Sequence, residues 1–194
     1  MSKTKLASKQ KKPAKNQVSM LQRQFDKIIG IAEQVYGVRS GLHQIVAPVF
    51  HQGIPDIEFM TGSNKVRARV SNEARVDVVK TAYQLAHEAV HCLHPRAQSE
   101  VTCLEEGIAA SFALWYIKLH HKASWLTSGD ANYDRVQDLV ELHVAHKVGV
   151  SNHIKALRTR RSSLSSIDSS DLKSMNPDMP DTVIADLLSI FKSP

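Results

Sequence analysis

The stretch "AYQLAHEAVHCLHP" (residues 82–95) places three histidines and a glutamate within eight positions. Its apolar residues recur at helical spacing, and Pro95 ends the pattern. His87 and His91 are four positions apart, so both imidazoles project from one face of a helix, about one turn apart. Glu88 lies roughly 100° around the same helix. The stretch therefore predicts a helix that presents two imidazoles beside a carboxylate.

This arrangement is typical of a metal site with a general base. Two imidazole nitrogens one turn apart can reach a single tetrahedral Zn²⁺ at about 2.0–2.1 Å. Glu88 is close enough to reach a water molecule on the metal without displacing it. Catalytic zinc also requires a third protein ligand and an open position. The third ligand must come from outside this helix turn.

Two nearby residues are weak candidates for the third ligand. His94 follows His91 at the helix end, where Pro95 breaks the geometry, and its side chain could instead interact with the last carbonyls of the helix. Glu100 falls in a short connection with no regular element to hold it rigidly.

Glu105 and Glu106 open the next apolar helix, expected over residues 101–121. Thr102 and Glu105 match the capping-box pattern, which assigns the Glu105 carboxylate to the backbone amide of Thr102. Glu106 is then left to face the site. Gly107 costs about 1 kcal/mol relative to Ala in a helix, and close approach of two helices around a metal explains tolerating it. We expect Glu106 as the third ligand, with Glu105 as the alternative.

These residues carry a resemblance to a known family. "HEAVH" (87–91), followed on the next helix by "LEEGIAA" (104–110), resembles the gluzincin group of zinc metallopeptidases. The match covers residues 81–116 well and only the general order of elements elsewhere. Fourteen residues separate His91 from Glu106, fewer than in the large aminopeptidases and thermolysin-like enzymes, which points to a compact member.

The resemblance implies a function and residue roles. It implies Zn²⁺ as cofactor, with His87, His91 and Glu106 as metal ligands and Glu88 as the catalytic base. It further implies hydrolysis of peptide bonds in a peptide or protein substrate. The alternative is a catalytically inactive zinc-binding module, regulatory or structural, whose closed site has four protein ligands. His94 joining the other three would favour that alternative.

No motif identifies the residue that stabilises the oxyanion in such a reaction. Tyr133, His143 and His146 are the candidates. His143 falls on an apolar stripe of its helix, so we expect it to face inward, where a histidine is more often structural than catalytic. The role stays unassigned, as do the natural substrate and the oligomeric state.

The order of patterns predicts an α+β fold. A helix is expected over residues 19–37, short strands within 43–50, 56–60 and 65–71, and helices from there to the C-terminus. We expect a small zincin-like domain with a short, mostly antiparallel sheet, in which the HExxH helix packs on a helical C-terminal half. The strand "KVRARVS" (65–71) alternates in a way that suits an edge strand, which could hold an extended peptide. The Ser-rich residues 162–171 look like a linker or turn region.

Charge and composition divide the chain in two. The first 15 residues hold six lysines and no acid, so the remaining 25 − 6 = 19 basic residues balance 19 acidic ones. We therefore expect a disordered Lys-rich tail over residues 1–18 and one domain over residues 19–194. The positive charge of the tail could also bind nucleic acid. We disfavour this alternative because the body is neutral and poor in aromatic residues.

Other features bear on where the chain works. Without a run of 18 apolar residues no membrane span is expected. Two cysteines are too few for a disulfide framework typical of secreted proteins, which favours a reducing, cytoplasmic setting.

Overall fold

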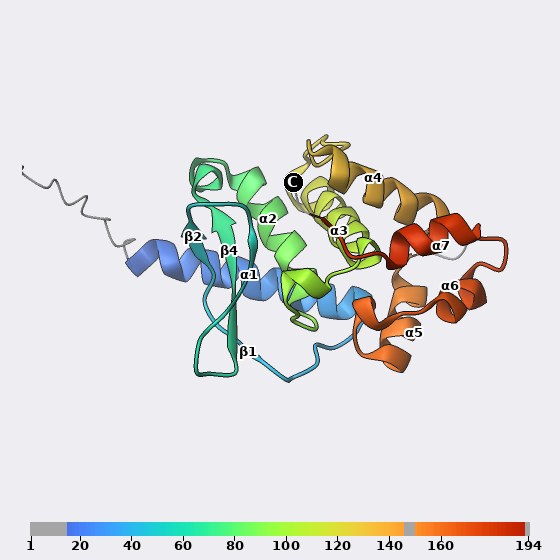
Figure 1. The fold of residues 1–194 in the computed structure, drawn as a ribbon. Helices are drawn as coiled ribbons and strands as arrows, with labels where there is room; N and C mark the ends of the chain where they lie inside the picture. The colour runs from blue at the N-terminus through green and yellow to red at the C-terminus, as the bar shows by residue number, and fades with distance from the viewer. Residues whose placement is uncertain (1–14, 146–149, 193–194) are drawn as a thin grey trace, which may run out of the picture.

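The computed structural model describes residues 15–145 and 150–192 (Figure 1). A short sheet near the N-terminus is followed by a series of helices. The elements, in chain order, are α1 (Lys15–Tyr36), β1 (Gln44–Ile45), β2 (Val49–His51), β3 (Asp56–Phe59), β4 (Lys65–Ser71), η1 (Asn72–Val76), α2 (Val78–His91), η2 (Gln98–Glu100), α3 (Cys103–His121), α4 (Ala131–Val140), the π-helical turn η3 (Glu141–Ala145), α5 (Val150–Arg161), η4 (Leu164–Ser166), α6 (Ser169–Met175) and α7 (Asp181–Leu188).

The fold is α+β, but the expectation of a mostly antiparallel sheet is wrong. β1 and β2 both run parallel to β4, and only β3 pairs with β4 in the antiparallel sense. A short connection that includes Gly62, with φ of 71°, joins β3 to β4 and reverses the chain. β1 and β2 reach β4 through longer connections, which permit the parallel direction.

β4 is the central strand, so the expectation that it forms an edge is also wrong. Its Lys65 carbonyl accepts from the Met60 amide on the β3 side at 2.9 Å. The next carbonyl, of Val66, accepts from the Val46 amide beyond β1 at 2.9 Å. Because successive carbonyls of a strand point to opposite edges, both edges of β4 are paired.

The arginines of β4, which suggested an edge, pair with β3. Arg69 Nε donates to Asp56 Oδ1 at 2.6 Å, and Arg67 forms an ion pair with Glu58. These pairs lie directly across the strands in the register of the hairpin. They cover the face of the sheet opposite the buried Val66, Ala68 and Val70.

α2 is the helix on which the rest of the fold is assembled. It packs against α3, α1 and β4, and Figure 1 shows it between the sheet and α3. Asp77 caps its N-terminus by accepting from the amides of Val79 and Lys80, each at 2.9 Å. Its inner face, including the fully buried Leu85 and Ala89, belongs to the main core.

A buried arginine fixes the C-terminal ends of α1 and α2. Arg158 is 7% exposed, and its guanidinium donates to the carbonyls of Tyr36, Gly37, Val38 and Leu93 at 2.6–3.2 Å. These carbonyls follow the last turns of the two helices, where the helix dipole favours a cation. Arg158 therefore ties α5 to the segment that follows His91.

The Ser-rich segment, expected as a linker or turn region, forms a turn that packs into the body. Ser163 is fully buried and accepts from Arg96 Nε at 2.8 Å, and Ser166 accepts from Arg96 Nη2 at 2.7 Å. Asp168 then begins α6 with a capping box. The chain returns to the same region at its end, where the Phe191 amide donates to the Val101 carbonyl at 2.9 Å.

Two further expectations concern the N-terminal tail and membrane spans. α1 begins at Lys15, inside the range expected to be tail, and residues 1–14 lie outside the described part of the chain. Among the described helices, none has both the length and the apolar character that crossing a bilayer requires.

Candidate metal centre

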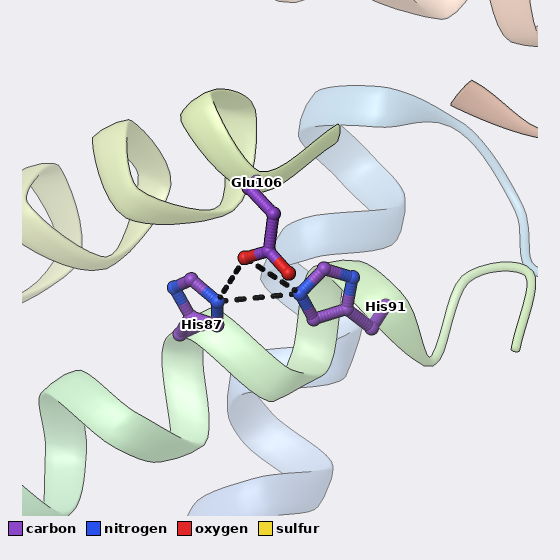
Figure 2. Close-up of side chains that lie close together, drawn as sticks. All are labelled: His87, His91 and Glu106. Atoms are coloured by element: carbon purple, nitrogen blue, oxygen red, sulfur yellow. Dashed lines mark hydrogen bonds and ion pairs between the residues drawn. The ribbon is translucent and has the colours of Figure 1, made fainter. Parts of the chain in front are cut away.

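His87, His91 and Glu106 meet in one buried cluster. One donor atom from each lies within 4.8 Å of the other two. His87 Nε2 lies 3.0 Å from Glu106 Oε2 and 3.2 Å from His91 Nε2, and His91 Nε2 lies 3.5 Å from Glu106 Oε2. Figure 2 shows the carboxylate of α3 facing both imidazoles of α2. The three residues named from the sequence are therefore brought together.

The other carboxylate oxygen of Glu106 is already occupied. Gln98, in η2, donates from Nε2 to Glu106 Oε1 at 3.1 Å. This hydrogen bond leaves Oε2 as the oxygen that faces the histidines. Glu106 would therefore offer one oxygen to an ion, as each imidazole offers one nitrogen.

Glu105 binds the far side of His91 rather than the cluster. His91 Nδ1 lies 2.9 Å from Glu105 Oε1. A carboxylate only accepts, so Nδ1 carries the proton and Nε2 is the nitrogen directed into the cluster. A carboxylate that fixes the tautomer and orientation of a histidine is the usual outer partner of a metal ligand.

The expected capping box is therefore only half formed. Thr102 Oγ1 accepts from the Glu105 amide at 3.4 Å, as the pattern predicts. The Thr102 amide, however, donates to Ser165 Oγ at 3.1 Å instead of to the Glu105 carboxylate. Ser165 in turn donates to Glu105 Oε2 at 2.6 Å. The Ser-rich segment thus reaches the candidate metal centre through the hydrogen-bonded chain Ser165–Glu105–His91.

Glu88 lies beside the cluster, not in it. Its side chain lines a pocket of about 170 Å³ together with His87, Tyr83 and Tyr133. Glu88 is 2% exposed, and it is not one of the three residues whose possible ligand atoms lie close together. This position fits a group that acts on a molecule in the pocket.

Burial and mutual contact set the ionisation of the site. Burial raises the pKa of Glu88 to about 8 and lowers the pKa of His87. For His91 burial lowers the pKa, but the carboxylates of Glu106 and Glu105 outweigh it and hold the pKa well above its ordinary value. Burial likewise raises the pKa of Glu106, but the charge of His91 and the hydrogen bonds from both histidines together outweigh burial and hold this pKa well below its usual range. Without a metal, His91 and Glu106 form a buried ion pair.

The other candidates separate by position. Tyr133 lines the pocket and its ring packs edge-on against His87, with centroids 5.5 Å apart. His143 lies in η3 and does not line the pocket, and His146 lies outside the described residues. His94 and Glu100 are not part of the group around His87.

Three residues of the site were not predicted from the sequence: Gln98, Ser165 and Tyr83. Gln98 and Ser165 belong to short turns and reach the ligands only through the tertiary fold. Tyr83 lies four positions before His87, on the same face of α2, and this helical spacing could have identified it as a pocket residue.

The hydrogen bond from Ser165 leads to a testable expectation. For a zinc ion held by His87, His91 and Glu106, Ser165→Ala is expected to weaken binding by about fivefold, less than the roughly 10–100-fold cost of removing a direct partner of a ligand. Glu105 would lose one hydrogen bond and hold the His91 ring less firmly. Competition titration with a chromophoric chelator measures the affinity.

Two variants control this experiment. Ser165→Thr keeps the hydroxyl and is expected to bind zinc like the wild type. Ser166→Ala removes a hydroxyl from the same turn that contacts Arg96 and not Glu105, so its affinity should be unchanged. Equal affinities in all four proteins would remove Ser165 from the metal centre.

Comparisons with known proteins add no relative to these observations. No protein-family model, no curated protein and no solved structure matches the chain.

Proposed function

We propose that this chain is a zinc-dependent peptidase that hydrolyses peptide bonds, with His87, His91 and Glu106 as metal ligands and Glu88 as general base. The observation that carries the proposal is the buried cluster of two imidazole nitrogens and one carboxylate oxygen, with a second carboxyl beside it in an open pocket. Two histidines and a glutamate are a common ligand set of catalytic zinc.

The donor set fits zinc in charge and chemistry. Nitrogen and carboxylate oxygen ligands suit Zn²⁺, and the outer partners Glu105 and Gln98 orient two of the three ligands. Zinc bound there would polarise the carbonyl of the substrate and lower the pKa of a water molecule toward 7. The alternative, an inactive zinc-binding module with a closed site, requires a fourth protein ligand. Within the described residues the group contains three, which favours the open, catalytic site.

The residues of the chain would then carry the proton transfers. Glu88 takes a proton from the attacking water molecule while the oxygen of that water adds to the carbonyl carbon. The C–N bond breaks, and Glu88 passes the proton to the leaving amine. Tyr133, which lines the same pocket, is the candidate that supports the oxyanion best by position.

β3 offers the better place for an extended substrate than β4. Among the described strands β3 pairs only with β4, so its outer edge carries backbone groups without a strand partner. Ile54 and Pro55, which lead into β3, line the pocket beside Glu88. A peptide added along this edge would run past the proposed metal site. A cytoplasmic setting is also part of the proposal, supported by two cysteines that are free and buried.

Zinc loading tests the proposal directly. The wild type is expected to bind one zinc per chain and to lose peptide cleavage in chelator and regain it with zinc. Glu106→Ala is expected to weaken zinc binding by more than the roughly 10–100-fold cost of losing an outer partner. Metal analysis, chelator competition and cleavage of a mixed peptide library are the measurements.

The control removes a glutamate that is close in sequence but absent from the cluster. Glu100, whose side chain is 59% exposed, forms an ion pair with Arg96, so Glu100→Ala should bind zinc normally. Cleavage by zinc-free protein would overturn the proposal.

A further inference from the structure

The pocket beside Glu88 has the size of a side-chain site rather than of a site for a whole small ligand. Its volume of about 170 Å³ lies below the roughly 300–1,000 Å³ typical of small-molecule sites. It opens at the metal cluster, because His87 and Glu88 form part of its lining. Whatever enters it lies next to the groups that would carry the reaction.

The walls of the pocket are apolar and aromatic. Ile54 and Pro55 form the side that leads into β3, and Tyr83 and Tyr133 form the side of α2 and α4. Trp125 packs behind Tyr83, with ring centroids 5.8 Å apart, and thickens that wall. Ile54 is 57% exposed, so the apolar surface continues to the mouth.

The polar groups of the lining are engaged within the protein. Gln84 accepts from the Ser71 amide at 2.9 Å, and Ser128 Oγ donates to Asp134 at 2.8 Å. Asp130 caps α4 by accepting from the Asn132 amide at 2.9 Å. Groups already paired in this way offer little to a ligand.

The charges of the lining disfavour an ionised side chain. No lysine or arginine lines the pocket, so an acidic side chain would lie near the Asp130 carboxylate and would find no basic side chain to pair with. The charge of Asp130 is already neutralised in part by the N-terminus of α4, so Asp130 would attract a basic side chain only weakly. Burying an unpaired charge is costly, whereas burying apolar surface is favourable.

We infer that this pocket receives an uncharged, apolar side chain of the substrate, from a residue adjoining the bond that is cleaved. The inference rests on the proposed function and adds the substrate class: peptides with a bulky aliphatic or aromatic residue at that position. The test compares peptides that differ only at this position, cleaved by the zinc-loaded protein. The kcat/KM for a peptide with Leu or Phe there is expected to be about tenfold or more above that for the Ala peptide, and about a hundredfold above that for the Glu peptide.

A charge placed at the mouth tests the inference. Ile54→Arg supplies a basic side chain at an exposed position of the lining and is expected to raise the Glu-to-Leu ratio of kcat/KM about tenfold. Val76→Arg makes a comparable change at a site 94% exposed and outside this pocket, and should leave the ratio unchanged. Both variants should retain the zinc affinity of the wild type.

The outcomes separate the two proposals. A zinc-loaded wild type that cleaves no peptide of a library varied on both sides of the bond overturns the proposed function, and the inference with it. Cleavage without preference for apolar residues, or the same shift in ratio for both arginine variants, overturns the inference alone. An apolar preference that shifts only in Ile54→Arg supports both.

Discussion

Replacing Glu88 with glutamine is expected to lower peptide turnover by about 10²- to 10⁴-fold, the contribution typical of a general base. Glutamine has nearly the same shape but cannot take up a proton at neutral pH. Zinc affinity is expected to stay within about twofold of the wild type, because Glu88 is not one of the cluster residues. The variant therefore separates proton transfer from metal binding.

Two measurements decide this prediction. Turnover of an apolar peptide gives the rate, and chelator competition gives the zinc affinity. Glu100→Gln is the matched control, since it makes the same change at a largely exposed glutamate of η2 and should be fully active. Full activity of Glu88→Gln would remove Glu88 as the base, whereas loss of zinc would identify it as a ligand.

The part of the site that could be predicted from the sequence is the part set by local geometry. His87 and His91 share a face because helical spacing brings positions i and i+4 together. Glu106 followed by elimination among four downstream groups, and the cluster contains it. Gly107 was expected to permit two helices to approach closely around a metal, but the helix that comes close to it is α4, at Val136 and Val140, and not the histidine-bearing α2.

The role of Glu105 could not be obtained in the same way. The capping-box pattern is local, and it identified the bond from the Glu105 amide to Thr102 correctly. The competing partners of the Glu105 carboxylate, His91 and Ser165, lie 14 and 60 positions away in the chain. Only the tertiary fold brings them within reach.

The sheet was mispredicted for a related reason. β1 and β2 contain two and three residues, too few for their patterns to indicate direction or partner. The alternating arginines of β4 suggested an edge strand, but they form ion pairs with Asp56 and Glu58 of the neighbouring β3. Composition suggested a linker or turn region at residues 162–171; the segment contains the short turn η4, and its Ser163 is fully buried.

Gly107→Ala is expected to destabilise the protein by about 2–3 kcal/mol, which is the reverse of its intrinsic helix propensity. An added Cβ would lie 2.4 Å from the Val136 carbonyl oxygen and 2.6 Å from Val140 Cγ2. The first of these contacts is with the backbone, so α3 and α4 would have to separate. For a chain of this size, the loss corresponds to a fall in Tm of roughly 4–12 °C.

The same substitution in α1 provides the control. Gly30 also lies within a helix, but no atom comes within 4 Å of an added Cβ there. Gly30→Ala is therefore expected to raise stability by up to about 1 kcal/mol. Thermal unfolding of both variants without metal measures the two effects, and a Gly107→Ala protein as stable as Gly30→Ala would contradict the close crossing. Because Glu106 precedes Gly107, separation of the helices should also move this carboxylate away from His87 and His91, so that Gly107→Ala, unlike Gly30→Ala, binds zinc more weakly.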